Sequence, residues 1–185
     1  MKAEIISVGT ELLLGHTVNS DASHVARELA ALGVDLLQVH TVGDNPGRLE
    51  KALREALARS EIVITTGGLG PTEDDLTKET VARVTGAPLE EHADSLARLR
   101  EYFGERPMSA NQYKQALLPR GATAFPNAAG TAPGCAVPAG EGRFVLLLPG
   151  PPSELQPMLR EGVVPFLQGL SGEAIASFMV KTFGI

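Results

Sequence analysis

The sequence predicts an α/β protein with a mostly parallel central sheet and helices on both faces of that sheet. Two observations predict this class. Short apolar runs typical of strands alternate along the chain with segments whose apolar residues recur at helical spacing. In addition, Ile62–Val63–Ile64 and the run at 144–148 are apolar at every position, as expected of strands that are buried on both faces.

Three strand-and-helix pairs are predicted in the first half of the chain. The apolar stripe of the first helix ends just before Gly33, a residue type common beyond a helix C-terminus. Asn45 and Pro46 supply a cap residue and a first-turn proline for the second helix, and Gly86–Ala87–Pro88 stops the third. Strands are expected at 3–8, 34–42 and 61–66, and helices at 20–32, 45–60 and 75–85.

The second half is expected to complete the sheet and to carry an insertion. An amphipathic helix at 90–103 and a looser amphipathic segment at 109–117 are predicted to lie over one edge of the sheet. Pro152 begins the last helix, which is expected at 152–167. The remaining strands are predicted at 122–124, 134–137 and 143–148.

The chain is divided at residue 168. Residues 1–168 are expected to form one domain, and 169–185 a linker with the start of a truncated following segment. In this interpretation Leu170–Ser171–Gly172 is the linker and Ala176–Phe183 is the first strand of that segment. The chain would then be either truncated or a stand-alone relative of a longer protein.

Composition limits the classes of partner. The chain has 185 residues, of which 43% are hydrophobic and 21% charged, which suits one compact domain. A formal charge of −6 argues against a nucleic-acid partner, and no apolar run reaches the ~20 residues that cross a membrane. Cys135 is the only cysteine, so a reducing cytoplasm is the expected location.

A glycine-rich loop follows the third predicted strand. Gly67, Gly68 and Gly70 allow the backbone to approach a phosphate closely, while Thr66 and Thr72 offer hydroxyl groups. The adjacent Asp74 and Asp75 would repel an anion unless a divalent cation lies between carboxylate and phosphate. The pattern therefore favours a metal-phosphate site, although acids beside a glycine turn also suit an ordinary helix N-terminus.

Further acids and turns are expected at the same edge of the sheet. Glu11 and Asp44 follow the first two strands, so they should lie beside Asp75 at the carboxyl ends of parallel strands. Asn127–Gly134 and Leu148–Glu154 form two more glycine-containing turns. Taken singly, each of these two segments is better explained as an ordinary turn than as part of a site.

Together these motifs resemble the N-terminal domain of the CinA family of competence- and damage-inducible proteins. The resemblance runs in order through residues 3–168, and it departs from the family pattern at Asp21, where a second asparagine is expected. The motifs that carry it are Gly9–Leu12, Thr65–Thr72 with Asp74 and Asp75, Asn111 with Lys114–Ala116, Asn127–Gly134, and Leu148–Pro152 with Glu154.

The resemblance implies a three-layer α/β/α fold of the molybdopterin-binding-like superfamily, which includes the molybdopterin adenylyltransferases. It also implies a metal-dependent ADP-ribose pyrophosphatase, which would cleave its substrate to AMP and ribose 5-phosphate. Residues 1–168 would then be the catalytic domain. The superfamily's shared acids would fall on Asp44 and Asp75, while Lys114 lies within a family motif.

The site residues are predicted on that basis. Asp44, Asp75 and Lys114 are expected to be catalytic, and Asp44, Asp74 and Asp75 to hold a divalent metal such as Mg²⁺, Mn²⁺ or Co²⁺. Substrate contacts are expected from Gly9, Thr10, Glu11, Thr66, Gly67, Gly68, Gly70, Pro71, Thr72, Asn127, Gly130, Thr131, Gly150 and Pro151.

The sequence is also consistent with two other functions. The same site could adenylylate molybdopterin, or the domain could bind nucleotides without catalysis as a module tied to competence or repair partners. A homodimer is also expected, because superfamily relatives self-associate and the insertion carries apolar and aromatic residues such as Leu96, Leu99 and Tyr102. Its contacts would use the insertion or the segment after Gly169.

Overall fold

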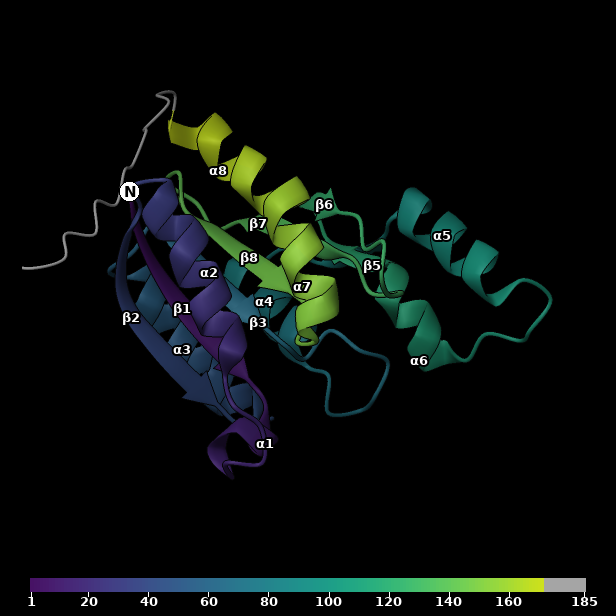
Figure 1. The fold of residues 1–185 in the computed structure, drawn as a ribbon. Helices are drawn as coiled ribbons and strands as arrows, with labels where there is room; N and C mark the ends of the chain where they lie inside the picture. Colours follow the sequence, from purple (N-terminus) through teal and green to yellow (C-terminus); the bar gives the residue numbers. More distant parts are fainter. Residues whose placement is uncertain (172–185) are drawn as a thin grey trace, which may run out of the picture.

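The computed structural model describes residues 1–171 and consists of a six-stranded sheet covered on both faces, with a helical insertion at one side (Figure 1). The strand order is β2-β1-β3-β8-β7-β6. Strands β1, β2, β3 and β8 are mutually parallel, whereas β7 runs antiparallel to both of its neighbours. The strands are β1 (Lys2–Val8), β2 (Asp35–Val42), β3 (Ile62–Thr66), β6 (Thr123–Phe125), β7 (Gly134–Pro138) and β8 (Phe144–Leu148).

Two hydrophobic cores make the fold a three-layer α/β/α sandwich. Alternate residues of β3 point to opposite faces, so that Ile62 and Ile64 join one core and Val63 joins the other. The first core contains residues of α2, α7 and α8, and the second contains residues of α3 and α4. These helices are α2 (Ser20–Ala31), α3 (Pro46–Leu57), α4 (Thr77–Thr85), α7 (Pro152–Met158) and α8 (Val164–Ser171). The predicted fold class is confirmed.

The insertion differs in detail from its prediction. The helix expected from residue 90 begins at Ala93, because Leu89–Glu91 forms strand β4, paired antiparallel with β5 (Leu117–Pro119). The segment expected at 109–117 is a short helix, α6 (Ala110–Tyr113), followed by a 3-10 turn. Helix α5 (Ala93–Phe103) packs on this segment, burying Leu96 and Leu99 with Ala116 in a small core. The apolar stripe is therefore covered within the insertion itself.

The C-terminal helix is longer than predicted. A π-helical turn at Leu159–Val163 joins α7 to α8, which continues to Ser171, so Gly169–Ser171 is helical and not a linker. A single glycine disfavours a helix by only ~1 kcal/mol, and the buried Leu167 anchors the preceding turn. The predicted strand 176–183 lies outside the described residues. None of the helices in 1–171 has the length and apolar character that a membrane span requires.

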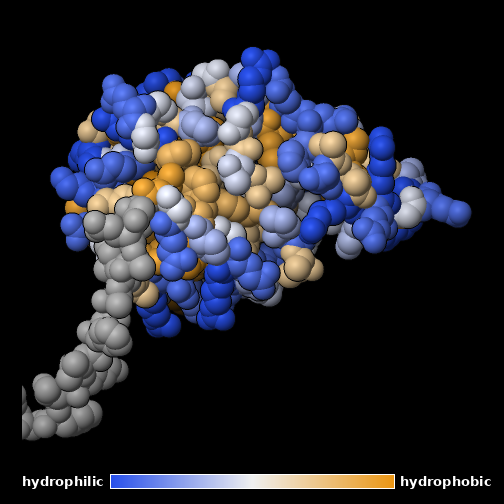
Figure 2. All heavy atoms as spheres, turned by 90° about the horizontal axis from the view of Figure 1, so that it is seen from above, coloured by the Kyte–Doolittle hydropathy of each residue, from blue (hydrophilic) through white to orange (hydrophobic). Residues whose placement is uncertain are grey.

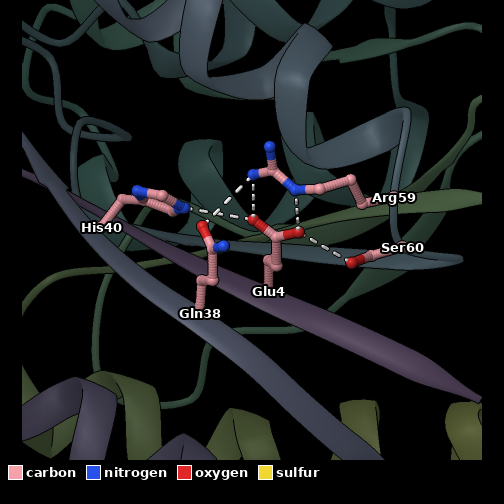
Figure 3. Close-up of polar contacts among 5 residues, drawn as sticks. All are labelled: Glu4, Gln38, His40, Arg59 and Ser60. Atoms are coloured by element: carbon pink, nitrogen blue, oxygen red, sulfur yellow. Dashed lines mark hydrogen bonds and ion pairs between the residues drawn. The ribbon is translucent and has the colours of Figure 1, made fainter.

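A buried carboxylate stabilises the end of the sheet away from the strand C-termini (Figure 3). Glu4 on β1 is fully buried and accepts two hydrogen bonds from the Arg59 guanidinium, at 2.9 and 3.1 Å, and one from Ser60 Oγ at 3.0 Å. His40 Nε2 lies 3.1 Å from the same carboxylate. Burial raises the pKa of Glu4, but its hydrogen bonds and the Arg59 charge outweigh burial and hold that pKa below its usual value.

Candidate active site

A cavity of about 800 Å³ lies at the carboxyl edge of the parallel strands. Its wall is formed by the segments that follow β1, β2, β3 and β8, and by the segment that precedes β7. Ligands bind at this edge in open α/β sheets. Of the residues predicted from the sequence, the cavity brings together Gly9, Glu11, Asp44, Thr66, Gly67, Gly68, Gly70, Pro71, Thr72, Asp74, Asp75, Gly130, Thr131, Gly150 and Pro151.

The glycine loop after β3 requires its glycines. Gly67 has φ +93°, and a Cβ there would collide with the Val8 carbonyl oxygen. Gly68 has φ +69°, and a Cβ there would collide with the Thr77 hydroxyl. Thr77 fixes this geometry, because its Oγ1 donates to Gly67 O at 3.0 Å and its N–H donates to Gly68 O at 3.2 Å.

The same loop offers three consecutive free backbone donors. The Gly67 N–H donates to Leu148 O at 3.0 Å. In contrast, the N–H groups of Gly68, Leu69 and Gly70 have no acceptor among residues 1–171, although all three residues line the cavity. Successive unpaired N–H groups in a turn are a concave binding site for an anion.

Asp75 holds the far side of this loop in place. Its Oδ2 accepts from the Thr72 N–H at 2.8 Å and from the Thr72 hydroxyl at 2.6 Å, and the carboxylate packs against Gly70. Asp74 is exposed and makes no hydrogen bond or ion pair within the described part of the chain. The two adjacent acids therefore differ, because one orders the loop and the other is free.

Asp44 is held by the loop that follows β1. The Thr10 N–H donates to Asp44 Oδ2 at 2.9 Å, and the Asp44 N–H donates to Thr10 Oγ1 at 3.0 Å. This reciprocal pair leaves Asp44 Oδ1 available at the cavity. Glu11 lies in the short helix α1 (Thr10–Leu13), and its carboxylate covers Gly9, where a Cβ would collide with it.

The cavity is strongly acidic. Its wall contains no Lys, Arg or His among the described residues, and its six carboxylates belong to Glu11, Asp21, Asp44, Asp74, Asp75 and Glu154. An anion would enter such a cavity only with a cation beside it, because unscreened like charges repel. The carboxylates thus suit a divalent cation that arrives with, or is shared by, an anionic ligand.

Oxygen donors of this kind fit Mg²⁺ and similar hard cations. Within residues 1–171, no group of three His, Cys, Asp or Glu side chains is close enough to form a complete metal-binding cluster. Mg²⁺ is commonly held by one or two carboxylates, waters and substrate phosphates, without a full protein cage. Asp44 Oδ1 and the Asp75 carboxylate fit that shared arrangement, and the carboxylates of Asp74 and Glu11 line the same cavity.

On the opposite wall, Asn127 fixes the segment that precedes β7. Its Nδ2 donates to Ala132 O at 2.8 Å and to Glu154 Oε2 at 2.7 Å, and its Oδ1 accepts from the Ala129 N–H. Glu154 lies over Gly130, where a Cβ would collide with its carboxylate. Asn127 therefore does not line the acidic cavity, but its hydrogen bonds hold the Gly130–Thr131 part of the wall in place from behind.

Three predicted residues lie outside the wall of this cavity. Thr10 and Asn127 support the wall from behind through the contacts described above. Lys114 is on the other side of the glycine loop, in a small adjoining space with Lys78. That space is also lined by Gly68, Gly70 and Asp75 of the glycine loop, so the catalytic role of Lys114 stays a prediction.

Several residues of the wall were not predicted as site residues, among them Glu154, Tyr102 and Asp21. Glu154 belongs to one of the motifs that carry the family resemblance, whereas the sequence contains no signal that links Tyr102 to the site. Asp21 showed a signal, since it replaces an expected asparagine. Its Oδ1 is buried without a hydrogen-bond partner, and burial raises the pKa of Asp21 to about 6 against the opposing effect of His24.

Comparison with known proteins defines the class. The family model described as "probable molybdopterin binding domain" matches residues 4–169, the same stretch that forms the sheet, the helices and the cavity.

Individual relatives show which members of this family the chain resembles in sequence and structure. A CinA-like protein of Desulfovibrio desulfuricans is 76% identical over the whole chain. The crystal structure of the protein CinA from Thermoplasma acidophilum is 34% identical, with a TM-score of 0.82 over 88% of this chain and 97% of that one. The chain therefore belongs to the molybdopterin-binding domain family as a CinA-like member. It spans 44% of the length of the Desulfovibrio relative.

The fold is shared more widely. The molybdopterin biosynthesis enzyme MoaB of Thermus thermophilus aligns with a TM-score of 0.60 over 93% of this chain and 97% of that one, at 23% identity. Identity at this level shows a common fold and no more. The same fold is thus found in an enzyme of molybdopterin biosynthesis.

Proposed function

We propose that this domain is a metal-dependent hydrolase of ADP-ribose, releasing AMP and ribose 5-phosphate. The observation that carries the proposal is the pairing of two features in one cavity. Three unpaired N–H groups of residues 68–70 form an anion site, and six carboxylates surround it with no cationic side chain. A diphosphate accompanied by a divalent cation satisfies both features.

Asp44 and Asp75 would hold the cation, with Asp74 or Glu11 as a further donor. A divalent cation in this position neutralises negative charge on the diphosphate oxygens. Thr10 and Thr72 keep the two principal carboxylates in place through the hydrogen bonds at 2.6–3.0 Å. The metal is expected to bind far more tightly in the presence of the diphosphate than alone, because the carboxylates do not form a complete cage.

The chain's own groups then perform the hydrolysis. The N–H groups of Gly68, Leu69 and Gly70 donate to diphosphate oxygens and stabilise the negative charge that develops in the transition state. A cavity carboxylate orients a water molecule and accepts its proton as the water oxygen bonds to one phosphorus in line. The bond from that phosphorus to the bridging oxygen breaks, and the bridging oxygen leaves with the second phosphate.

Nucleotide transfer to molybdopterin is the second candidate. The observation that favours it is the shared fold with a molybdopterin biosynthesis enzyme. Both chemistries need a metal-bound diphosphate, so the acid cavity alone does not separate them. Binding without catalysis is the third possibility.

One experiment separates the three. The purified protein is incubated with ADP-ribose, and separately with molybdopterin and ATP, each with Mg²⁺, Mn²⁺ or Co²⁺ and with excess chelator. We expect AMP and ribose 5-phosphate from ADP-ribose only when a divalent cation is present, measured by ion-exchange chromatography. Adenylylated molybdopterin as the sole product would support transfer, and binding without any product would support a recognition module.

A further inference from the structure

A second cavity of about 520 Å³ lies beneath helix α5. It is formed between one side of that helix and the segment from β6 to β7, with the buried residues Leu99 and Pro133 in its wall. Its volume falls within the ~300–1,000 Å³ range of small-molecule pockets. None of the residues named from the sequence as metal ligands or catalytic groups lines this cavity.

The second cavity adjoins the acidic one. Tyr102, Gly130 and Thr131 line both of them. The sheet order places the acidic loops after β2, β1 and β3, whereas the second cavity lies beside β6 at the other end of the sheet. A ligand with its diphosphate on the glycine loop would reach the second cavity by passing Gly130 and Thr131 toward α5, which lies in the insertion at one side of the sheet (Figure 1).

The chemistry changes along this path. The first cavity contains six carboxylates, but the second contains only one, Asp94. Its wall combines apolar groups such as Leu99, Ala124 and Pro126 with the aromatic side chain of Tyr102 and the guanidinium of Arg98. A molecule that fills both cavities must have a charged, metal-binding part and a flatter, less polar part.

Polar groups of the second cavity are available for specific contacts. Arg98 has no ion pair or hydrogen bond within residues 1–171, and the same holds for the side chains of Asp94 and Thr131. Heteroaromatic bases offer edge donors and acceptors to such groups, and their faces stack on aromatic and guanidinium planes. The Arg106 guanidinium already lies 5.5 Å from the Tyr102 ring centroid, so the Arg98 guanidinium is the plane that an aliphatic or purely sugar-like ligand would leave without a matching surface.

We infer that the cavity beneath α5 binds the purine nucleoside end of the substrate, while the ribose 5-phosphate end remains in the acidic cavity. This inference rests on the proposed function and specifies the orientation of the substrate. Tyr102 and Arg98 contact the base. Thr131 lines both cavities, so it lies where the two parts of the ligand join. The products therefore differ in their binding sites, since AMP occupies the cavity beneath α5 and ribose 5-phosphate does not.

The test uses the two products as separate probes. Ala97 is exposed on α5 and lines the cavity, so Ala97→Trp should fill it without disturbing a core. In isothermal titration with Mg²⁺ present, we expect this variant to bind AMP at least about tenfold more weakly, the effect of losing base stacking. Binding of ribose 5-phosphate should remain within about twofold of wild type.

Matched controls come from the same helix. Ala93 and Arg100 are also exposed on α5 but do not line the cavity. Ala93→Trp should bind AMP as the wild type does, and Arg98→Ala should weaken AMP where Arg100→Ala does not. Thermal unfolding of all four variants verifies that the fold is intact.

Failure of this inference can be distinguished from failure of the proposed function. Unchanged AMP affinity in Ala97→Trp, or no AMP binding by the wild type at millimolar concentration, would overturn the inference even if ADP-ribose is hydrolysed. Altered oligomeric state in Ala97→Trp with unchanged AMP affinity would make the cavity a protein interface and would also overturn it. AMP binding that is lost in Ala97→Trp, without any hydrolysis by the wild type, would support the inference and contradict the proposed function.

Discussion

At the residue scale, Asp75 combines two roles that one substitution can separate. Its carboxylate orders the glycine loop through Thr72, and in the proposed function it also holds the cation. Asn in its place retains an oxygen that can accept from Thr72 but loses the negative charge. Asp75→Asn therefore tests the negative charge of the side chain while it keeps the loop contact.

We expect Asp75→Asn to lower the turnover of ADP-ribose by about 100-fold or more, since a metal donor is lost. Its free energy of unfolding should change by less than about 1 kcal/mol, because the acid lies at the rim and Asn preserves the loop contact. Steady-state kinetics and urea denaturation provide the two readouts. The neighbouring Glu73→Gln, which does not line the cavity, should have neither effect; near-normal turnover or unfolding of Asp75→Asn would remove Asp75 from the site.

Asp21, in the wall of the acidic cavity, lowers the stability of the folded protein when its carboxyl is ionised. Burial raises the pKa of its carboxyl to about 6, and Oδ1 has no hydrogen-bond partner. A carboxyl whose pKa is raised on folding destabilises the folded state wherever it is ionised. That destabilisation is absent below the unfolded pKa near 3.8, grows between pH 4 and 6, and is complete above pH 6.

We therefore predict that Asp21→Asn stabilises the free protein above pH 6, on the order of 1 kcal/mol once solvent screening of this half-buried group is allowed for. The stabilisation should vanish near pH 4. Thermal unfolding of both proteins between pH 4 and 8 measures it, with Asp35→Asn at an exposed strand position as the control. A difference that does not depend on pH would show that the charge of Asp21 is not its source.

Sequence reasoning located most of the acids but not their individual roles. Asp44, Asp75 and Glu11 follow parallel strands, so the rule that strand C-termini share one edge was enough to bring them together. The exposed Asp74 and the loop-bound Asp75 are adjacent and chemically identical in the sequence, and only the hydrogen bonds of Thr72 distinguish them. The sequence likewise contains no sign that Glu154 covers Gly130, because their contact depends on two separate loops.

At the scale of elements, Lys78 connects helix α4 to the insertion. It is 6% exposed, and its Nζ donates to Lys114 O at 3.0 Å and Gln115 O at 3.2 Å. Burial lowers the pKa of Lys78. Lys78 therefore fixes the 3-10 turn of the insertion beside the glycine loop.

We expect Lys78→Met to lower the free energy of unfolding by about 1–3 kcal/mol, because two backbone carbonyls lose their donor. Met preserves the length and apolar stem of the side chain, so packing should change little. Urea denaturation measures the effect, and Lys51→Met, at an exposed position on α3, should stay within about 0.5 kcal/mol of wild type. Equal stability of the two variants would contradict the role assigned to Lys78.

Elements were predictable where their signals are local. The consecutive apolar residues of β3 and the Asn45–Pro46 start of α3 specify their structures within a few positions. The β4–β5 pair was missed because Leu89 and Pro119 pair across a separation of 30 residues. The π-helical turn was missed as well: Pro165 lacks an N–H for the Glu161 carbonyl, and its effect on the helix emerges only in the folded packing.

At the scale of the whole molecule, we predict a homodimer. The insertion is a weaker candidate for the interface than the sequence indicated, since Leu96 and Leu99 are buried in its own small core. The C-terminal segment is favoured, because α8 lies at the top of the molecule in Figure 1 and apolar side chains gather in the middle of that face in Figure 2. Leu170 at the end of α8 is 39% exposed.

Light scattering at micromolar concentration should therefore return twice the 19.4 kDa of one chain. Leu170→Glu should shift this value toward that of the monomer, because a charge would have to be buried in the contact. The exposed Tyr102→Glu tests the insertion in the same way. A mass near 19.4 kDa for the wild type would exclude the dimer.

The central claim is that the acidic cavity hydrolyses a diphosphate by attack of water on phosphorus. The most direct measurement is the reaction of ADP-ribose in ¹⁸O-labelled water with Mg²⁺, followed by mass spectrometry of the products. We predict AMP and ribose 5-phosphate, one of which carries a single ¹⁸O on its phosphate. No product, or cleavage that leaves both phosphates unlabelled, would contradict the account.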